Sequence, residues 1–317
     1  MIIEEAKKLN YTINIISDKM HFFTIKNKKK EILFKNIDCW LNNSLAVKFA
    51  RQKKLSYFML WREWIKVPKS IITTKWENID NILWSLKENK ISFPLVIKPS
   101  IGEHWNGVSI NIKNKEDIIK AIKYALSFHH QIIIQEFFSW EDHRLIVVWW
   151  KLISVTQKIP AHVISDGKHT IKKLIDIENT NPLRWNKEEK PLTKISVDEE
   201  SKQCLRNQWY TLRSTPKKNK EIFLRKNANL STWWMSIDMT DIVHPEIKNM
   251  AEHVAKILWL EICWIDYLSE DIRKPLKKQT WGIIEVNHTP WLRCPHAPAI
   301  GKPRNVAKAI LQLAFKK

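Results

Sequence analysis

Residues 96–112 read VIKPSIGEHWNGVSINI, and this stretch decides the fold. An apolar strand ends at Lys98, a short loop follows, and a second strand begins at Val108. The loop holds Gly102 and Gly107, two of the five glycines in the chain. Glycine lets a backbone approach a bound group closely, and successive backbone N–H groups form a concavity that binds anions. The stretch therefore predicts two strands joined by a glycine-containing loop that follows a lysine; by itself such a loop is a weak signal for anion binding.

Strands and helices alternate along the rest of the chain. Residues 115–128 carry apolar side chains at helical spacing, and 131–138 read as a buried strand. Residues 143–159 have the pattern of a β-hairpin with Trp149–Trp150 at its turn. Further elements are expected as helices at 43–64, 166–177 and 302–315, as strands at 260–268 and 281–287, and as a small α/β portion within 1–50. This order of elements indicates an α/β or α+β fold.

The composition limits the class of protein. The chain has 317 residues with 44% hydrophobic side chains, enough for two or three sub-domains around a sizeable core. No apolar run is long enough for a membrane span, and the first residues do not resemble a signal peptide. Four cysteines without a CxxC pair suggest neither zinc nor disulfides, so we expect a reducing cytoplasm.

The net charge of +20 suggests anionic partners. The lysines are scattered, and short clusters occur only at 27–30 and 217–220. No RRM, KH or zinc-finger signature accompanies them, so nucleic acid is not the expected partner. Nucleotides and acidic substrates fit the charge better.

The glycine and tryptophan counts are abnormal. Globular chains average roughly 7% glycine, which predicts about 22 residues here. The chain has 5 glycines and 17 tryptophans. Two tryptophan pairs also fall in predicted turns, Trp149–Trp150 and Trp233–Trp234. Such turns need positive φ and favour glycine or asparagine, so bulky indoles are unexpected there.

The chain resembles the ATP-grasp superfamily, and specifically the ATP-grasp module of cyanophycin synthetases. The resemblance covers roughly residues 43–310. It rests on VIKPSIGEHWNGVSINI, IIIQEFFSWEDHRLIVVWWKLISVTQKIPAHVISDGKHTIKKLI, NPLRWNKEEKPLTKI, FLRKNANLSTWWMSIDMTDIVHPE, EICWIDYLSED and WGIIEVNHTPWLRCPHAPAIGKPRNV. The ATP-grasp half of bifunctional glutathione synthetases shares some of these stretches.

The resemblance implies an ATP-grasp fold of the α/β (α+β) class, with two α+β lobes sandwiching ATP after a short N-terminal α/β portion. We expect the N-terminal portion at 1–50, a lid lobe at 51–137 and a catalytic lobe at 138–317.

The family pattern has glycine where this chain has tryptophan. The positions are Trp105, Trp140, Trp149, Trp150, Trp233, Trp234, Trp264 and Trp291, with Trp64, Trp185, Trp209 and Trp259 in places where glycine is common. Trp281 fits as a true tryptophan. Because some bacteria read UGA as glycine, we hypothesise that most of these residues are glycine in the cell.

The resemblance also implies a set of ATP-binding residues. Lys53 and Lys98 would contact the phosphates, and the loop with Gly102 and Gly107 would fold over them. The backbone of Glu136, Phe137 and Phe138 would read the adenine edge. Asp142 would bind the ribose.

The expected metal ligands are Asp266, Glu285 and Asn287. Mg²⁺ prefers hard oxygen ligands, and residues two apart on a strand point to one face. ATP with two Mg²⁺ ions is therefore the expected cofactor set, and Mn²⁺ could replace Mg²⁺. Arg144, Arg225 and Asn227 are the expected catalytic residues, with Arg225 stabilising the transferred phosphoryl group.

The implied function is an ATP-dependent carboxylate–amine ligase that acts through an acylphosphate. Its partners would be ATP and carboxylate or amine substrates, including small molecules, peptides or an acidic acceptor, and it could be a homo-oligomer. The segment HTPWLRCPH and the stretch around Lys187, Glu188 and Glu189 depart from the family pattern, which leaves the amino-acid specificity open. The alternatives are an ATP-binding pseudoenzyme and a basic RNA-associated protein.

Overall fold

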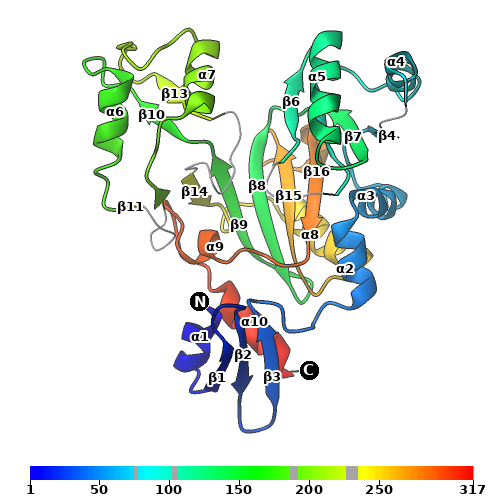
Figure 1. Cartoon of the computed structure of the whole chain (residues 1–317). Helices are drawn as coiled ribbons and strands as arrows, with labels where there is room; N and C mark the ends of the chain where they lie inside the picture. The colour runs from blue at the N-terminus through cyan, green and yellow to red at the C-terminus, as the bar shows by residue number, and fades with distance from the viewer. Residues whose placement is uncertain (75–76, 102–105, 186–191, 226–234, 317) are drawn as a thin grey trace.

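The computed structural model describes residues 1–74, 77–101, 106–185, 192–225 and 235–316, with the side chain of Trp185 left aside. Three main β-sheets of three, four and five strands organise this part of the chain (Figure 1). No helix within it is long and apolar enough to cross a membrane.

The N-terminal sheet is antiparallel, in the order β1-β2-β3. Its elements are α1 (Ile2–Lys8), β1 (Thr12–Ser17), β2 (Phe22–Lys26) and β3 (Glu31–Lys35). The C-terminal helix α10 (Val306–Lys316) packs on it, because Phe23, Ile25 and Phe34 share one buried core with Ile310 and Leu313. The two ends of the chain therefore meet in one unit (Figure 1).

The second sheet has the order β4-β7-β5-β6 and corresponds to the expected lid. Its elements are β4 (Ser70–Thr74), α4 (Ile79–Glu88), β5 (Leu95–Pro99), β6 (Ser109–Ile112), α5 (Lys115–Leu126) and β7 (Gln131–Glu136). The helices α4 and α5 pack on the sheet through Ile82, Ile118 and Ala121. The quoted stretch thus forms β5 and β6 with its loop between them.

The central sheet is antiparallel, in the order β14-β9-β8-β15-β16. Its strands are β8 (Glu141–Val148), β9 (Lys151–Ile159), β14 (Met235–Asp238), β15 (Ile262–Ser269) and β16 (Trp281–Asn287). Leu145, Val147 and Ile265 point to one face, where α8 (Pro245–Ile257) covers them. Alternation places Asp142, Arg144 and Asp266 on the opposite face.

The expected helix at 43–64 is two helices, α2 (Ser44–Arg51) and α3 (Lys53–Arg62). The break lies at Gln52, whose φ of −107° and ψ of 96° are extended. Ala46, Ala50 and Leu60 lie in the same core as the central sheet. Residues 51–65 therefore pack with the central sheet, although the sequence analysis assigned them to the lid lobe. The domain boundaries stay a prediction.

A smaller unit is inserted between β9 and β14, within residues 161–225. Its elements are β10 (His162–Ile164), α6 (Ile171–Glu178), β11 (Arg184–Trp185), β12 (Leu192–Thr193), α7 (Glu199–Asn207) and β13 (Glu221–Phe223). A separate core holds them together, with Val163, Ile175, Leu205 and Ile222 at its centre. The short helix α9 (Arg293–His296) and the 3₁₀ turn Leu276–Lys278 complete the fold.

Among the residues that the structure describes, six tryptophans adopt the left-handed backbone region, with φ between 50° and 65°. Trp64, Trp209 and Trp259 each stand one residue beyond the C-cap of α3, α7 or α8. The residue after each donates its N–H five residues back, to Leu60, Leu205 and Ala255 in turn, as in a Schellman motif. Trp149 and Trp150 close the two-residue turn between β8 and β9, and Trp40 is the sixth. Glycine is the residue that such positions favour.

Candidate functional site

Acidic and basic side chains form a row across the open face of the central sheet. Glu285 on β16 lies directly opposite Asp266 on β15, and Asp266 lies directly opposite Arg144 on β8. Asn287 is opposite Trp264, two residues along on the same face. The structure therefore brings together the three side chains expected to hold a metal and places Arg144 beside them.

A buried lysine that the sequence analysis did not predict joins this row. Lys158 on β9 places its Nζ 2.7 Å from Oδ2 of Asp142 and 3.3 Å from Oδ1 of Asp266. Arg144 Nε lies 3.4 Å from the same Asp266 oxygen. The side chains of Lys158 and Arg144 are 7% and 8% exposed, so two cations and two carboxylates share a nearly dry site. The alternation along β9 could have revealed Lys158, because it pairs with Asp142 across the hairpin.

Two buried polar atoms in this cluster lack partners. Nη1 of Arg144 and Oδ1 of Asp142 make no hydrogen bond within the part of the chain that the structure describes. An unpaired buried donor or acceptor carries a desolvation penalty, and bound ligands are one way to satisfy it. The cluster thus offers a cationic donor for an anion and a carboxylate oxygen for a hydroxyl group.

The two carboxylates differ in their electrostatics. Burial raises the pKa of Asp142, and the cations nearby offset this only in part. Burial acts in the same direction on Asp266, but Lys158 and Arg144 outweigh it, so the pKa of Asp266 lies below its ordinary value. The lowered pKa of Asp266 favours its charged form, which a metal ligand requires.

Two lysines approach the row from other elements. Lys53, at the start of α3, places its Nζ 2.8 Å from Oε1 of Glu285. The same helix is anchored by the Tyr57 hydroxyl, which donates to the carbonyl of Ile284 at 2.5 Å. Lys98 on β5 is buried, and burial with Lys53 nearby lowers the pKa of Lys98 from 10.5 to about 7. A phosphate group next to such a lysine would stabilise its charged form.

Gly107 follows the loop after β5 in a left-handed conformation where a side chain would be strained and crowded. Its φ is +74°, and a Cβ atom would lie 2.8 Å from Pro99 and 2.9 Å from Phe128. Gly102, the other expected loop glycine, lies outside the described residues.

The expected adenine-reading segment is already engaged in part. The N–H of Glu136 donates to the carbonyl of Lys69 at 3.2 Å, and that of Phe137 donates to the carbonyl of Pro94 at 2.9 Å. Phe138 stacks on Trp140, with ring centroids 4.3 Å apart. These two N–H groups therefore bond to Lys69 and Pro94 within the protein. Contacts with adenine are then expected only from the other backbone groups of the segment.

Arg225 lies in the inserted unit, where its described contacts are with α7. It is 2% exposed and donates to Asp198 at 2.8 and 2.5 Å and to Ser201 Oγ at 2.7 Å. Asp198 also caps the N-terminus of α7. These contacts do not include the row on the central sheet, because Asp198, distant in sequence, directs the guanidinium toward α7. Asn227 lies outside the described residues.

Comparison with known proteins shows which proteins this chain is similar to. Residues 50–162 match the family model of the RimK-like ATP-grasp domain. The chain carries an ATP-grasp domain. It is 36% identical over 271 residues to the cyanophycin synthetase of Trichormus variabilis, covering 86% of this chain and 30% of that protein. It is 31% identical over 320 residues to the bifunctional glutathione biosynthesis protein of Clostridium perfringens, covering 99% of this chain and 40% of that protein.

The likeness extends to the three-dimensional structure of this ATP-grasp protein. The bifunctional glutathione synthetase of Pasteurella multocida superposes with a TM-score of 0.75 and 25% identity, over 99% of this chain and 43% of that protein. The chain thus spans about a third of the length of the curated relatives that it matches. The expected fold is confirmed.

The donor set of this ATP-grasp domain fits a magnesium ion. Asp266, Glu285 and Asn287 offer hard oxygen atoms on one face, which is the chemistry that Mg²⁺ prefers. The described residues contain no group of three His, Cys, Asp or Glu side chains able to hold a metal ion. A metal here would therefore depend on the Asn287 amide oxygen and on oxygens from outside the chain.

Proposed function

We propose that this protein is an ATP-dependent ligase that joins a carboxylate to an amine through an acylphosphate. The observation that supports this most is the row Glu285–Asp266–Arg144, with an unpartnered buried Arg144 Nη1 beside two carboxylates. Phosphoryl transfer depends on fixed cations and metal-binding oxygens in a site that excludes water. Arg144 would be the fixed cation, and Asp266 and Glu285 would contribute metal-binding oxygens.

In the proposed reaction the γ-phosphoryl group of ATP passes to an oxygen of the substrate carboxylate, and ADP is released. The amine then attacks the acyl carbon, phosphate leaves, and the amine loses a proton. Lys53 and Lys98 would hold the phosphates before transfer, and Arg144 and Lys158 would stabilise the charge on the transferred group. Asp142 would accept a hydrogen bond from the ribose.

Asp266, Glu285 and Asn287 would hold Mg²⁺, and we propose two ions as in the expected cofactor set. The chemistry supplied there would be neutralisation of negative charge on the phosphates. Lys53 pairs with Glu285, so this lysine would lie between the proposed metal site and the phosphates.

The substrates are proposed from the names of the relatives. These name cyanophycin and glutathione, so we propose an amino acid as one substrate and a peptide or acidic acceptor as the other. The net charge of +20 suits an acidic acceptor, and we propose that the protein works in the cytoplasm.

The test is a screen for ADP release against amino acids and short acidic peptides. It compares the protein that carries tryptophan at five positions with a variant that carries glycine there. The five positions are Trp105, Trp149, Trp150, Trp233 and Trp234. We expect amino-acid-dependent ADP release in the glycine variant and its loss in Arg144→Gln. ATP binding without ADP release under every combination would contradict a ligase and favour a pseudoenzyme. Salt-sensitive RNA binding without such release would favour the RNA-associated alternative.

A further inference from the structure

Segment 288–304 crosses the open face of the central sheet from one edge strand to the other. It begins where β16 ends, passes through α9, and reaches β14 before α10 starts (Figure 1). Beside β14 it forms an isolated parallel β-bridge between Ile300 and Ile237. Ala299 N–H donates to the carbonyl of Ser236 at 2.9 Å, and Asp238 N–H donates to the carbonyl of Ile300 at 2.9 Å.

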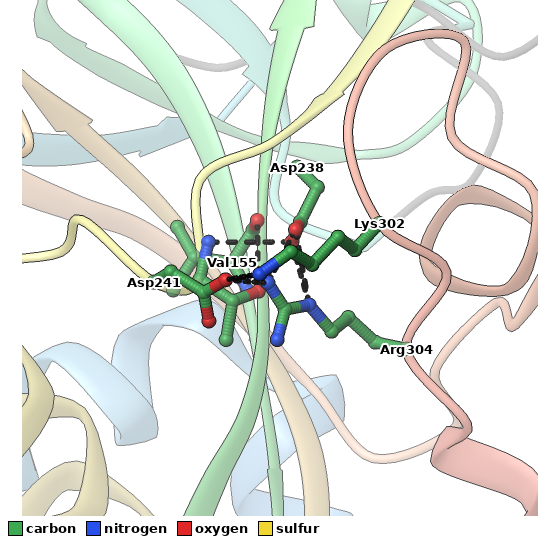
Figure 2. Close-up of polar contacts among 6 residues, drawn as sticks. Val155, Asp238, Asp241, Lys302 and Arg304 are labelled. Carbon is green, nitrogen blue, oxygen red and sulfur yellow. Dashed lines mark hydrogen bonds and ion pairs between the residues drawn. The ribbon is translucent and has the colours of Figure 1, made fainter.

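An ion-pair cluster fastens this segment to β14 (Figure 2). Arg304 Nε lies 3.1 and 3.0 Å from the two carboxylate oxygens of Asp238, and its Nη2 lies 2.6 Å from Oδ2. Its Nη2 also lies 2.9 Å from Asp241, which Lys302 contacts at 2.8 Å. Planar, two-pronged pairs of this type are the strongest and most directional ion pairs in proteins.

The carboxylate of Asp238 is itself fixed to the sheet. The Thr240 hydroxyl donates to Asp238 Oδ1 at 2.5 Å and accepts from the N–H of Val155 on β9 at 3.0 Å. The Asp238 side chain is 7% exposed, and the pair with Arg304 is largely screened from water. Hydrogen bonds from Arg304 and Thr240 outweigh burial and hold the pKa of Asp238 below its ordinary value.

Asp238 belongs to the same cross-strand row as the proposed chemistry. It lies opposite Thr156, which lies opposite Arg144, which lies opposite Asp266. Gly301 packs so closely that a Cβ there would lie 2.7 Å from Asp238. The cluster therefore fastens the C-terminal end of segment 288–304 to the edge of the sheet that carries Arg144 and Lys158.

We propose that the Arg304–Asp238 pair is a latch that holds segment 288–304 over this face and so positions the acceptor substrate. Arg304 and Asp238 are positioning residues, because their contacts are with each other and with the sheet and not with the row's metal-binding side chains. The proposal rests on the proposed ligase function. Positional errors of about 1 Å in a reacting group can slow a reaction roughly 100-fold, which is the scale on which a loosened segment would act.

The test compares Arg304→Gln, Arg304→Lys and the control Lys302→Gln. The control removes an exposed ion pair of the same cluster, since the Lys302 side chain is 75% exposed, and leaves the Asp238 pair intact. Hydrogen exchange is measured at the amides of Ala299, Ile300 and Asp238, together with the Kd for ATP and the kcat and KM for the acceptor.

We expect Arg304→Gln to accelerate exchange at these three amides and to lower acceptor-dependent kcat/KM roughly 10- to 100-fold, while the Kd for ATP stays unchanged. Arg304→Lys should recover part of both effects, and Lys302→Gln should resemble the unmodified protein. The lysine variant keeps the charge and supplies the measurement if the glutamine variant does not fold.

Two results would overturn the latch. One is unchanged exchange at the three amides in Arg304→Gln. The other is faster exchange with an unaltered kcat/KM, or with a Kd for ATP that worsens in parallel. Exchange does not depend on turnover, so it tests the latch separately from the ligase reaction. ATP binding without ADP release in the unmodified protein would refute the proposed function instead.

Discussion

Tryptophan occupies several positions where the left-handed backbone conformation favours glycine. Trp64 and Trp209 lie beyond helix ends with φ of 59° and 64°, and they are 92% and 95% exposed. Trp281 differs in every respect, because it is buried in a strand, packs near Tyr267 and donates its indole N–H to Leu276 at 3.1 Å. Trp281 thus contributes to the buried core, whereas Trp64 and Trp209 are exposed at backbone positions that favour glycine.

Replacing the helix-end residues by glycine should stabilise the protein. We expect Trp64→Gly, Trp209→Gly and Trp259→Gly to raise the free energy of unfolding by about 1 kcal/mol each, because left-handed geometry is costly for residues with a Cβ. Urea unfolding of each variant measures this. The control Trp281→Gly should instead lose about 3–5 kcal/mol through the cavity that it leaves. Equal losses at all four positions would contradict the argument.

The same geometry supports the decoding hypothesis. We propose that these tryptophans, together with the turn pair Trp149–Trp150, are glycine in the cell that makes the protein. Peptide mass spectrometry of the protein from its own cells should find glycine at the five positions. UGG codons there, or tryptophan in the peptides, would show that the residues are genuine.

The depressed pKa of Lys98 predicts how ATP binding depends on pH. The phosphates favour the charged lysine, so binding between pH 7 and 10.5 should take up close to one proton, and affinity should fall as pH rises above 7. Calorimetry in buffers of different ionisation enthalpy measures the uptake. Lys98→Arg stays protonated throughout and should abolish it, while buffer-independent heats in the unmodified protein would refute the prediction.

Without ATP the same lysine acts on stability with the opposite sign. The folded pKa of Lys98 is depressed, so between pH 7 and 10.5 the unfolded chain binds a proton that the folded chain does not. This group therefore makes the free energy of unfolding rise with pH in that window.

At the scale of elements, the register of β15 and β16 creates the proposed metal site. We therefore expect Asp266→Asn to raise the Mg²⁺ concentration for half-maximal ATP turnover by at least about tenfold. Losing a residue that only hydrogen-bonds to a metal ligand already lowers metal affinity about 10- to 100-fold. Magnesium titration of ADP release measures this. Asp142→Asn is the comparison: it also removes a carboxylate bound to Lys158, and as the proposed ribose partner it should change the KM for ATP rather than the magnesium requirement. Equal shifts in both variants would show a general charge effect.

Element boundaries were predictable where local signals were strong. The spacing of Glu285 and Asn287 and the apolar run before Asp266 placed the three side chains on neighbouring strands. The break at Gln52 had no such signal, since residues 43–64 contain no glycine or proline to mark it. That break places Lys53 at a helix start, where it meets Glu285.

At the scale of the whole molecule, the inserted unit within 161–225 has a core of its own. We expect Ile175→Ala, which removes about 2–5 kcal/mol of packing energy, to loosen this unit alone. Hydrogen exchange should then rise within 161–185 and 192–225 and stay unchanged in β5 and β7. Ile134→Ala, in the lid core, should show the reverse pattern. Exchange that rises everywhere in both variants would show one cooperative unit.

The sequence alone determined the family, the alternation of elements and the residue types of the site, because these depend on periodicity and short-range spacing. Only the tertiary structure decided which groups meet. Asp198 holds Arg225 across 27 positions of sequence, and Asp238 holds Arg304 across 66. Ion pairs between distant elements follow from how cores pack, and no local pattern along the chain records that packing.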